Sequence, residues 1–286
     1  MKMGGWVVGA ALLLSGAPLV AANGKEPVAL EPSMPWKIHS TGDFCRLWRS
    51  FGTGKQAITV VLDNFDNDED FRITLAGRPM LAAKRDGSVQ LRFGDALPEQ
   101  SLAFDSGTFA RKPAWIVKTA IRIRPDPDGI DPRPITAEEE ASVAAIRIGE
   151  PLRQPARLDT GPMGEAFALM RDCTEEMIGG WGIDVVRHRH LSRPATPVGS
   201  PGQWIRGTDY PMSMIRKMQS GIVRFRLMVG EDGAPTACHI QLSTNPEGFD
   251  AAVCDALMKR ARFKPALDAD GKPLPSYYRN SVMFSF

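Results

Sequence analysis

In the last third of the chain, hydrophobic residues recur at helical spacing in some segments and at every second position in others. After Tyr210-Pro211, apolar residues recur at helical spacing, and proline suits the first turn of a helix. Over 222–229, apolar residues occupy every second position with arginines between them, which predicts a half-buried strand. The next elements expected are a turn at 231–233, a strand at 238–243, a helix at 247–262 and a strand at 278–286. This order predicts a three-stranded antiparallel sheet with two helices on one face.

The region before this module is rich in short β-type runs separated by turn signals. Residues 37–51 are predicted as a strand entering a short turn, with Cys45 and Trp48 facing inward. Further strands are expected at 57–62, 71–75, 89–93, 101–104 and 115–123. This spacing predicts an antiparallel meander in a sheet or half-barrel.

Two helices are expected after the meander. Thr136 and Glu139 form a capping box, in which hydroxyl and carboxylate satisfy the free amides at a helix start. A second helix is predicted to begin near Gly161-Pro162 and to stop at Gly179-Gly180, with Cys173 on its apolar stripe. The fold class is therefore α+β: a β-rich N-terminal domain with two helices, followed by the small C-terminal domain.

The first 22 residues have the pattern of a secretory signal peptide. A basic start at Met1-Lys2 precedes an apolar run and a small-residue cleavage site before Asn23. The alternative is an uncleaved inner-membrane anchor, although the run is short for a span. We predict export to the periplasm, and four parts of the chain. They are a signal peptide at 1–22, a companion domain of unknown function at 27–190, a Pro/Gly/Ser linker at 191–204 and the C-terminal domain at 205–286.

The four cysteines form an even set, as expected for disulfides in an exported protein. Cys238 faces the core side of its strand, and Cys254 lies on the helix that covers the same side, so we predict a bridge between them. Cys45 then pairs with Cys173. Of the three possible pairings, this one alone keeps both bridges within domains. The alternative is buried free thiols.

Five fragments near the C-terminus fall in the order and spacing of a known family. They are Tyr210-Pro211, the strand segment 221–227, Asp232-Gly233, Phe249-Asp250 and Arg262-Phe263-Lys264-Pro265-Ala266. Through them, roughly the last 80 residues resemble the TonB C-terminal domain. The resemblance implies a periplasmic domain with the helix–strand–strand–helix–strand order predicted above. It also implies a partner in the cell envelope, possible coupling to transmembrane transport, and no enzymatic activity in this domain.

In that family, the domain pairs with a short segment of an outer-membrane transporter, which adds as a strand beside its last strand. The resemblance places the pairing edge here at Tyr277, Tyr278, Arg279, Asn280, Ser281, Val282 and Met283. The alternative is an ordinary strand edge guarded by Arg279 and Asn280. Family members that transduce energy carry a histidine in an anchor helix and a long Pro-rich spacer. The apolar run at the N-terminus has no histidine and no such spacer follows it, so energy transduction is not expected.

Three short motifs invite a chemical interpretation, and each has a structural alternative. Asp159-Thr160-Gly161 matches the triplet of aspartic proteases, but one copy is present where two are needed, and Asp159 or Thr160 would cap the following helix. The acidic run 63–70 lacks the glycine and glutamate of a calcium loop, so a solvated turn is favoured. His188 and His190 have zinc-compatible spacing but no third ligand nearby, which favours a surface pair.

The net charge of +2 gives no reason to expect a nucleic-acid partner. The chain contains no CxxC pair, no phosphate-binding glycine loop and no metalloprotease motif. We therefore predict no catalytic residues, no metal and no small-molecule cofactor. The predicted function is protein–protein interaction by strand addition to an envelope partner such as a TonB-dependent outer-membrane transporter. The alternatives are an exported enzyme with its site in the N-terminal domain, and a structural envelope module.

Overall fold

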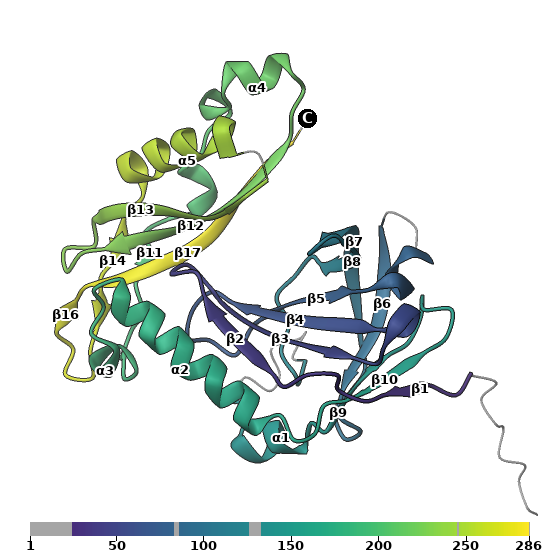
Figure 1. Ribbon diagram of the computed structural model, residues 1–286. Helices are drawn as coiled ribbons and strands as arrows, with labels where there is room; N and C mark the ends of the chain where they lie inside the picture. Colours follow the sequence, from purple (N-terminus) through teal and green to yellow (C-terminus); the bar gives the residue numbers. More distant parts are fainter. Residues whose placement is uncertain (1–24, 83–85, 126–132, 245, 286) are drawn as a thin grey trace, which may run out of the picture.

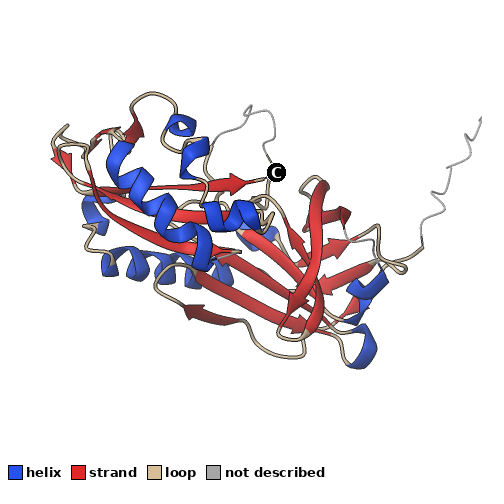
Figure 2. Cartoon of the chain, turned by 90° about the horizontal axis from the view of Figure 1, so that it is seen from above, coloured by secondary structure: helices blue, strands red, loops and turns tan. Residues whose placement is uncertain are grey.

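The computed structural model describes residues 25–82, 86–125, 133–244 and 246–285 (Figure 1). The predicted signal peptide at 1–22 lies outside the described residues. The N-terminal half is built on one large sheet, and a smaller sheet follows near the C-terminus, as Figure 2 shows in red. The predicted α+β class is therefore confirmed.

The large sheet has ten strands in the order β1-β10-β9-β6-β7-β8-β5-β4-β3-β2. They are β1 (Val28–Leu30), β2 (Lys37–Ser40), β3 (Cys45–Phe51), β4 (Ile58–Asn64), β5 (Arg72–Ala76), β6 (Asp86–Phe93), β7 (Gln100–Phe109), β8 (Lys112–Val117), β9 (Ala145–Ile148) and β10 (Ala156–Asp159). All neighbours are antiparallel except β1 and β10. Strand β7 alternates between buried and exposed residues over its first half, which places one face toward a shared core, whereas every residue of β4 is buried. The fully buried aromatic residues of that core include Phe51, Phe93, Phe104 and Trp115.

Three helices accompany this sheet. The capping box at Thr136 starts α1 (Ala137–Ser142), as predicted. The long helix α2 (Gly164–Gly180) buries the stripe Ala166, Phe167, Met170 and Met177 and packs against β2 and β3. The disulfide Cys45–Cys173 joins α2 to β3, with 6.1 Å between the Cα atoms. A short helix, α3 (Val185–His188), follows.

The C-terminal module is the predicted small sheet with two helices. Its strands β12 (Gly221–Val229), β13 (Pro235–Ser243) and β17 (Ser276–Phe284) lie in the order β13-β12-β17, all antiparallel. Helices α4 (Met212–Arg216) and α5 (Pro246–Arg260) accompany it, and α5 packs on β12 and β13. The disulfide Cys238–Cys254 joins β13 to α5, with 5.6 Å between the Cα atoms. The short strands are β11 (Thr196–Pro197), β14 (Phe263–Lys264), β15 (Ala266–Leu267) and β16 (Pro273–Leu274), and the 3-10 turns are Gly54–Gln56, Arg78–Ala82, Pro201–Gln203 and Gly207–Asp209.

The segment 191–204, predicted as a linker, lies along the C-terminal module. Strand β11 pairs with β14, and Ser192 donates hydrogen bonds to carbonyls at Leu267 and Asp268. Trp204 is buried in the core of the module. This segment is therefore packed, and the four-part division of the chain remains a prediction.

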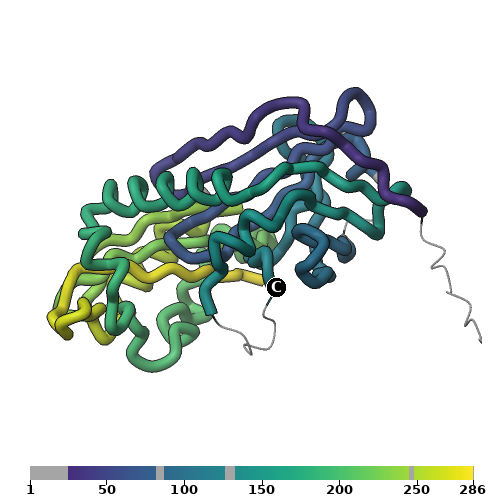
Figure 3. The backbone as a smooth tube through the Cα atoms, turned by 90° about the horizontal axis from the view of Figure 1, so that it is seen from below, coloured from purple at the N-terminus to yellow at the C-terminus, as the bar shows by residue number. Residues whose placement is uncertain are grey.

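The two parts of the molecule meet across the small sheet. Helix α5 covers one face of this sheet, and the N-terminal domain together with α2 lies on the other side (Figures 1 and 3). Arg226 on β12 has its guanidinium 3.7 Å from the centroid of the Trp181 ring and 3.3 Å from the Asp43 carboxylate. Gln241 on β13 donates to the Asp43 carbonyl at 2.8 Å. The small sheet is thus the middle layer of the molecule.

Several sequence predictions for the N-terminal domain were wrong. Residues 37–51 form two strands, and Trp48 lies on the face opposite to Cys45 because the two are three residues apart and side chains alternate along a strand. The strand predicted at 115–123 ends at Val117. Strands β1, β9 and β10 were missed because each has only three or four residues, too few to show a period.

Candidate functional site

Strand β17 is an edge of the small sheet. Its register with β12 runs from Gly221 opposite Phe284 to Val229 opposite Ser276. Among the described strands, β17 pairs with β12 alone. The sequence predicted this strand because apolar residues alternate along it. The apolar side chains on the face toward the helices pack in the core of the module, and they are Tyr278, Val282 and Phe284. The seven residues of the predicted pairing edge all lie on this strand.

The outer backbone groups of β17 belong to its odd-numbered residues. The N–H of Ser281 donates to the Asn280 side chain at 2.8 Å, so it points away from β12. On β12, Ile222 bonds with Thr244 on the β13 side, so the next residue, Val223, faces β17. Donor and acceptor of one residue in an antiparallel strand point the same way, and the direction alternates. The residues whose backbone groups face outward are therefore Tyr277, Arg279, Ser281 and Met283.

An apolar groove of about 350 Å³ lies beside this edge on the helix side. Trp204, Ile205, Phe225, Leu257 and Val282 supply most of its apolar lining. Segment 201–205 forms the opposite wall, so the packing of this segment on the module creates the groove. An apolar side chain from a strand laid along β17 would find a complementary surface here.

On the other side of the sheet, the N-terminal half of β17 is held by the companion domain. The Tyr277 ring lies 5.1 Å from the centroids of both Trp181 and His188. His188 Nε2 is 2.9 Å from the Ser276 hydroxyl. Burial lowers the pKa of His188, which keeps the imidazole neutral, and burial raises the pKa of the Tyr277 phenol. This half of the strand is a fixed interface.

Arg279 joins β17 to the acidic loop that follows β4. Its guanidinium pairs with Asp66 and, at 3.3 Å, with Asp68. Asp66 also accepts the backbone N–H of Asp68, and Asp68 accepts that of Asp70. Burial, followed by the nearby Asp66 carboxylate, raises the pKa of Asp68 to about 8.

The outer half of β17 faces a second cavity, of about 180 Å³, on the companion-domain side. It is lined by Phe65, Arg224, Gln241, Arg279, Asn280 and Ser281. The same strand edge at 280–281 therefore borders an apolar groove on one face and a basic cavity on the other.

The family comparison agrees with this geometry. Residues 206–286 match the family model described as Gram-negative bacterial TonB protein C-terminal. The resemblance found in the sequence is thereby confirmed for this part of the chain. The match covers the C-terminal module and does not extend to residues 1–205. No match was found among curated proteins or among solved structures.

The three motifs considered as possible protease, calcium or zinc sites have other roles in the structure. Asp159 pairs with Arg157, and the residue that caps α2 is Met163, so the predicted cap at Asp159 or Thr160 was wrong. The acidic run is not a solvated turn, because Asp63 and Asp66 are buried. His188 is half-buried against Tyr277, whereas His190 is exposed, so the predicted surface pair holds for His190 alone. In the described part of the chain, no three His, Cys, Asp or Glu side chains are grouped to hold a metal ion.

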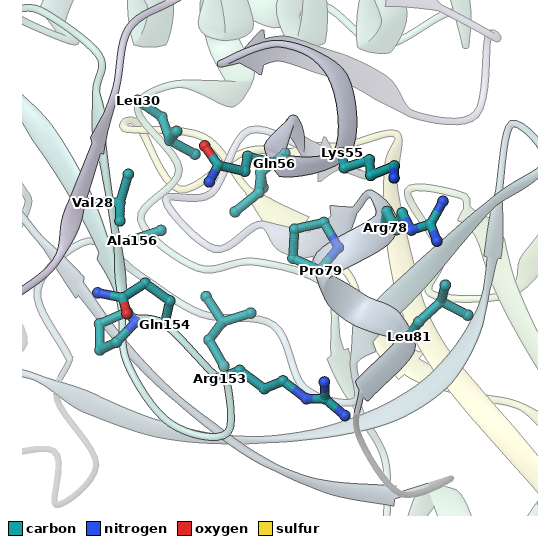
Figure 4. Close-up of a pocket in the computed structure, with 13 residues that line it drawn as sticks. Val28, Leu30, Lys55, Gln56, Arg78, Pro79, Leu81, Arg153, Gln154 and Ala156 are labelled. Carbon is teal, nitrogen blue, oxygen red and sulfur yellow. The ribbon is translucent and has the colours of Figure 1, made fainter. Parts of the chain in front are cut away.

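A cavity beside the large sheet is relevant to the alternative that the N-terminal domain is an enzyme. It measures about 360 Å³ and lies between β1, the start of β10 and the turn at Arg78–Ala82 (Figure 4). Gln154 lies across it from Arg78 and Leu81, and its other long polar side chains are Lys55, Gln56 and Arg153. Among the described residues that line it there is no carboxylate, imidazole, hydroxyl or thiol. The cavity therefore lacks a paired nucleophile and general base.

None of the helices in the part of the chain that the structure describes has the length and apolar character needed to span a membrane.

Sequence analysis missed some residues that lie next to the edge strand β17. Arg224 was assigned only to the polar face of its strand, and Trp181 was given no role. Trp181 contacts Arg226 and Tyr277 on the small sheet, and Arg224 lies near Phe65 and Arg72 of the N-terminal domain. These residues are far apart in the sequence, as are Asp43 and Arg226, which are 183 positions apart, and no local pattern marks such contacts.

Proposed function

We propose that this protein binds an extended segment of another cell-envelope protein, such as an outer-membrane transporter, by strand addition to β17. The observation that carries the proposal is the outer edge of β17 at Arg279, Ser281 and Met283, which pairs with no other strand in the described part of the chain. Backbone hydrogen bonds to these residues would supply much of the affinity, and side-chain pockets on either face would supply specificity.

The groove beside Val282 supports an apolar residue at alternate positions of the guest segment. Two exposed apolar side chains on the opposite face extend the contact surface, since Met283 is 71 % exposed and lies in register with Ile222, which is 39 % exposed. Exposed apolar residues that adjoin an open sheet edge are typical of interaction sites.

A proline substitution tests strand addition directly. Ser281→Pro removes an outward N–H and leaves the ladder to β12 intact, because proline is tolerated at the outer face of an edge strand. Tyr278→Pro would instead break the pairing with Leu227 and disturb the module itself. Ser281→Ala is the matched control, since it keeps the N–H.

The measurement is photo-crosslinking in cells, with a benzophenone side chain at position 283 and, as a control, at position 239 on the exposed part of β13. We expect one envelope protein to crosslink from 283 and not from 239. Ser281→Pro should reduce its yield about tenfold or more, and Ser281→Ala should not. Equal yields from Ser281→Pro and Ser281→Ala would contradict strand addition at this edge.

A further inference from the structure

The cavity on the companion-domain side of β17 contains an arginine without a partner. Arg224 lies on β12 opposite Ser281 on β17, and its guanidinium has no hydrogen bond or ion pair with any described residue. The cavity has room for a small group at about 180 Å³. Burial, reinforced by the nearby guanidiniums of Arg72 and Arg279, lowers the pKa of Arg224 to about 10.

The acids around this cavity are already engaged. Asp63 accepts from Arg46 at both carboxylate oxygens, at 2.6 and 2.8 Å. Asp66 and Asp68 pair with Arg279.

Asp43, which lies further along the interface, pairs with Arg226. The arginines near the cavity therefore outnumber the acidic side chains that remain available to pair with Arg224.

A second arginine beside the cavity is also incompletely bonded. Arg72 lies over the ring of Phe65, which lines the cavity, and its Nε and Nη2 atoms are buried without a hydrogen-bond partner among the described residues. The Nε of Arg279 is buried and unbonded in the same way. Buried N–H donors of charged groups are costly when they are left unsatisfied. An anion in this cavity would offer an acceptor to Arg224 and Arg279, which line it, and would lower the electrostatic cost of the nearby Arg72.

The cavity can be reached from the edge of the sheet. A guest strand would lie one strand spacing beyond β17, so its backbone would be about 10 Å from β12. Ser281 is the residue between them on this face, and its short side chain leaves the path open. A glutamate or aspartate on the guest, pointing to the companion-domain side, could therefore extend over Ser281 toward Arg224.

We infer that the cavity at Arg224 binds an oxyanion group, and that its ligand is the carboxylate of an acidic residue on the segment that adds to β17. The second half of this inference rests on the proposed function. The guest would then carry an apolar side chain toward the groove at Val282 and an acidic side chain toward Arg224. Guanidinium–carboxylate pairs in such a setting are strong and directional.

The anion site is tested first without any peptide. Inorganic phosphate and, separately, acetate are titrated into the full chain labelled with ¹⁵N-arginine, and the Nε–Hε resonances are followed. We expect a saturable shift of the Arg224 resonance. In Arg224→Gln, the response of the neighbouring Arg72 and Arg279 resonances should weaken about tenfold or more. Arg216→Gln, on the exposed end of α4, is the matched control and should bind as the wild type does.

The guest carboxylate is tested with two heptapeptides of alternating valine and threonine that begin with valine. Their central threonine is replaced with glutamate in one and with glutamine in the other. We expect the glutamate peptide to bind about tenfold more tightly than the glutamine peptide, and we expect Arg224→Gln to abolish that difference while leaving the glutamine peptide unaffected.

These experiments test the anion site and its occupation by a guest carboxylate separately. No saturable shift of Arg224 with either anion would overturn the site. A shift with phosphate or acetate, together with equal binding of both peptides or binding of neither, would show a free oxyanion as the ligand and overturn the guest carboxylate. Failure of the proposed strand addition is detected separately, by equal crosslinking in Ser281→Pro and Ser281→Ala.

Discussion

Asp66 and Asp68 contact the same guanidinium but differ in their surroundings. Asp66 is 9 % exposed, whereas the side chain of Asp68 is 42 % exposed. The nearby Asp66 carboxylate adds to the effect of burial in disfavouring the ionised form of Asp68, because like charges close together repel each other. The raised pKa of Asp68, about 8 against an ordinary value of 3.8, assigns the proton to that residue.

The pH dependence of stability follows from this assignment. Because the folded pKa of Asp68 lies above the unfolded one, its contribution to stability is full below pH 3.8 and is lost as the pH rises through about 8. Asp68→Asn cannot ionise and still accepts the Asp70 N–H. We expect the free energy of unfolding of Asp68→Asn to fall less than that of the wild type between pH 5 and pH 8.5, measured by urea unfolding.

Asp66→Asn is the matched comparison, since it removes the closer partner of Arg279. It should destabilise the protein at pH 7 by about 1–3 kcal/mol. Parallel pH profiles for Asp68→Asn and the wild type would show that Asp68 is ionised throughout and would refute the assignment.

At the scale of secondary-structure elements, the backbone amides of β17 alternate in direction along the strand. The amides of Tyr278, Asn280 and Val282 point to β12, and those of the odd-numbered residues point outward. Hydrogen exchange resolved by residue should show this alternation. We expect the amides of Tyr278, Asn280 and Val282 to exchange about tenfold or more slowly than the Met283 amide, because bonded amides exchange only when the strand opens.

Ser281 provides an internal check on the exchange pattern. Its amide is capped by the Asn280 side chain, so Asn280→Ala should speed exchange at Ser281 and leave Tyr278 unchanged. Uniform protection along the strand, without alternation, would mean that the outer edge is paired in solution.

Hydrophobic periodicity predicted the elements with long, regular patterns. It failed where the pattern was short, and where a residue's surroundings come from a part of the chain far away in the sequence. β12 and β17 alternate over nine residues each, so their faces and pairing were predictable from the sequence. The edge residues could be named for the same reason, with the help of the TonB resemblance. The role of Arg224 could not be predicted, because its setting depends on Arg72 and Phe65 from the other domain, and neither carries a sequence signal for that contact.

At the scale of the whole molecule, the companion domain covers the face of the small sheet that α5 leaves open. Arg226 is central to this contact. It is 4 % exposed, it lies over Trp181, and it pairs with Asp43. Trp181 in turn donates to the carbonyl of Gly42 at 2.7 Å. The N-terminal domain also contributes Phe65 to the lining of the basic cavity, so it would form part of the proposed binding surface.

Arg226→Gln should loosen this contact. Loss of the ion pair and of the cation–π contact should cost about 1–3 kcal/mol, with the lower end favoured because Asp43 is partly exposed. We expect a red shift of tryptophan emission and an increase in the radius of gyration measured by small-angle scattering. Arg216→Gln is again the control. Unchanged scattering and emission would mean that the remaining contacts hold the two parts together without Arg226.

The small sheet also ends at β13, and this second margin is irregular. The β12–β13 register shifts between Arg224 and Phe225 and again between Met228 and Val229, which interrupts an even row of backbone groups. If both margins were regular, β17 of one molecule could join β13 of the next, and such head-to-tail contacts propagate into filaments. With a single regular margin, the proposed strand addition would stop after one guest, which favours one-to-one complexes over polymers of the same chain.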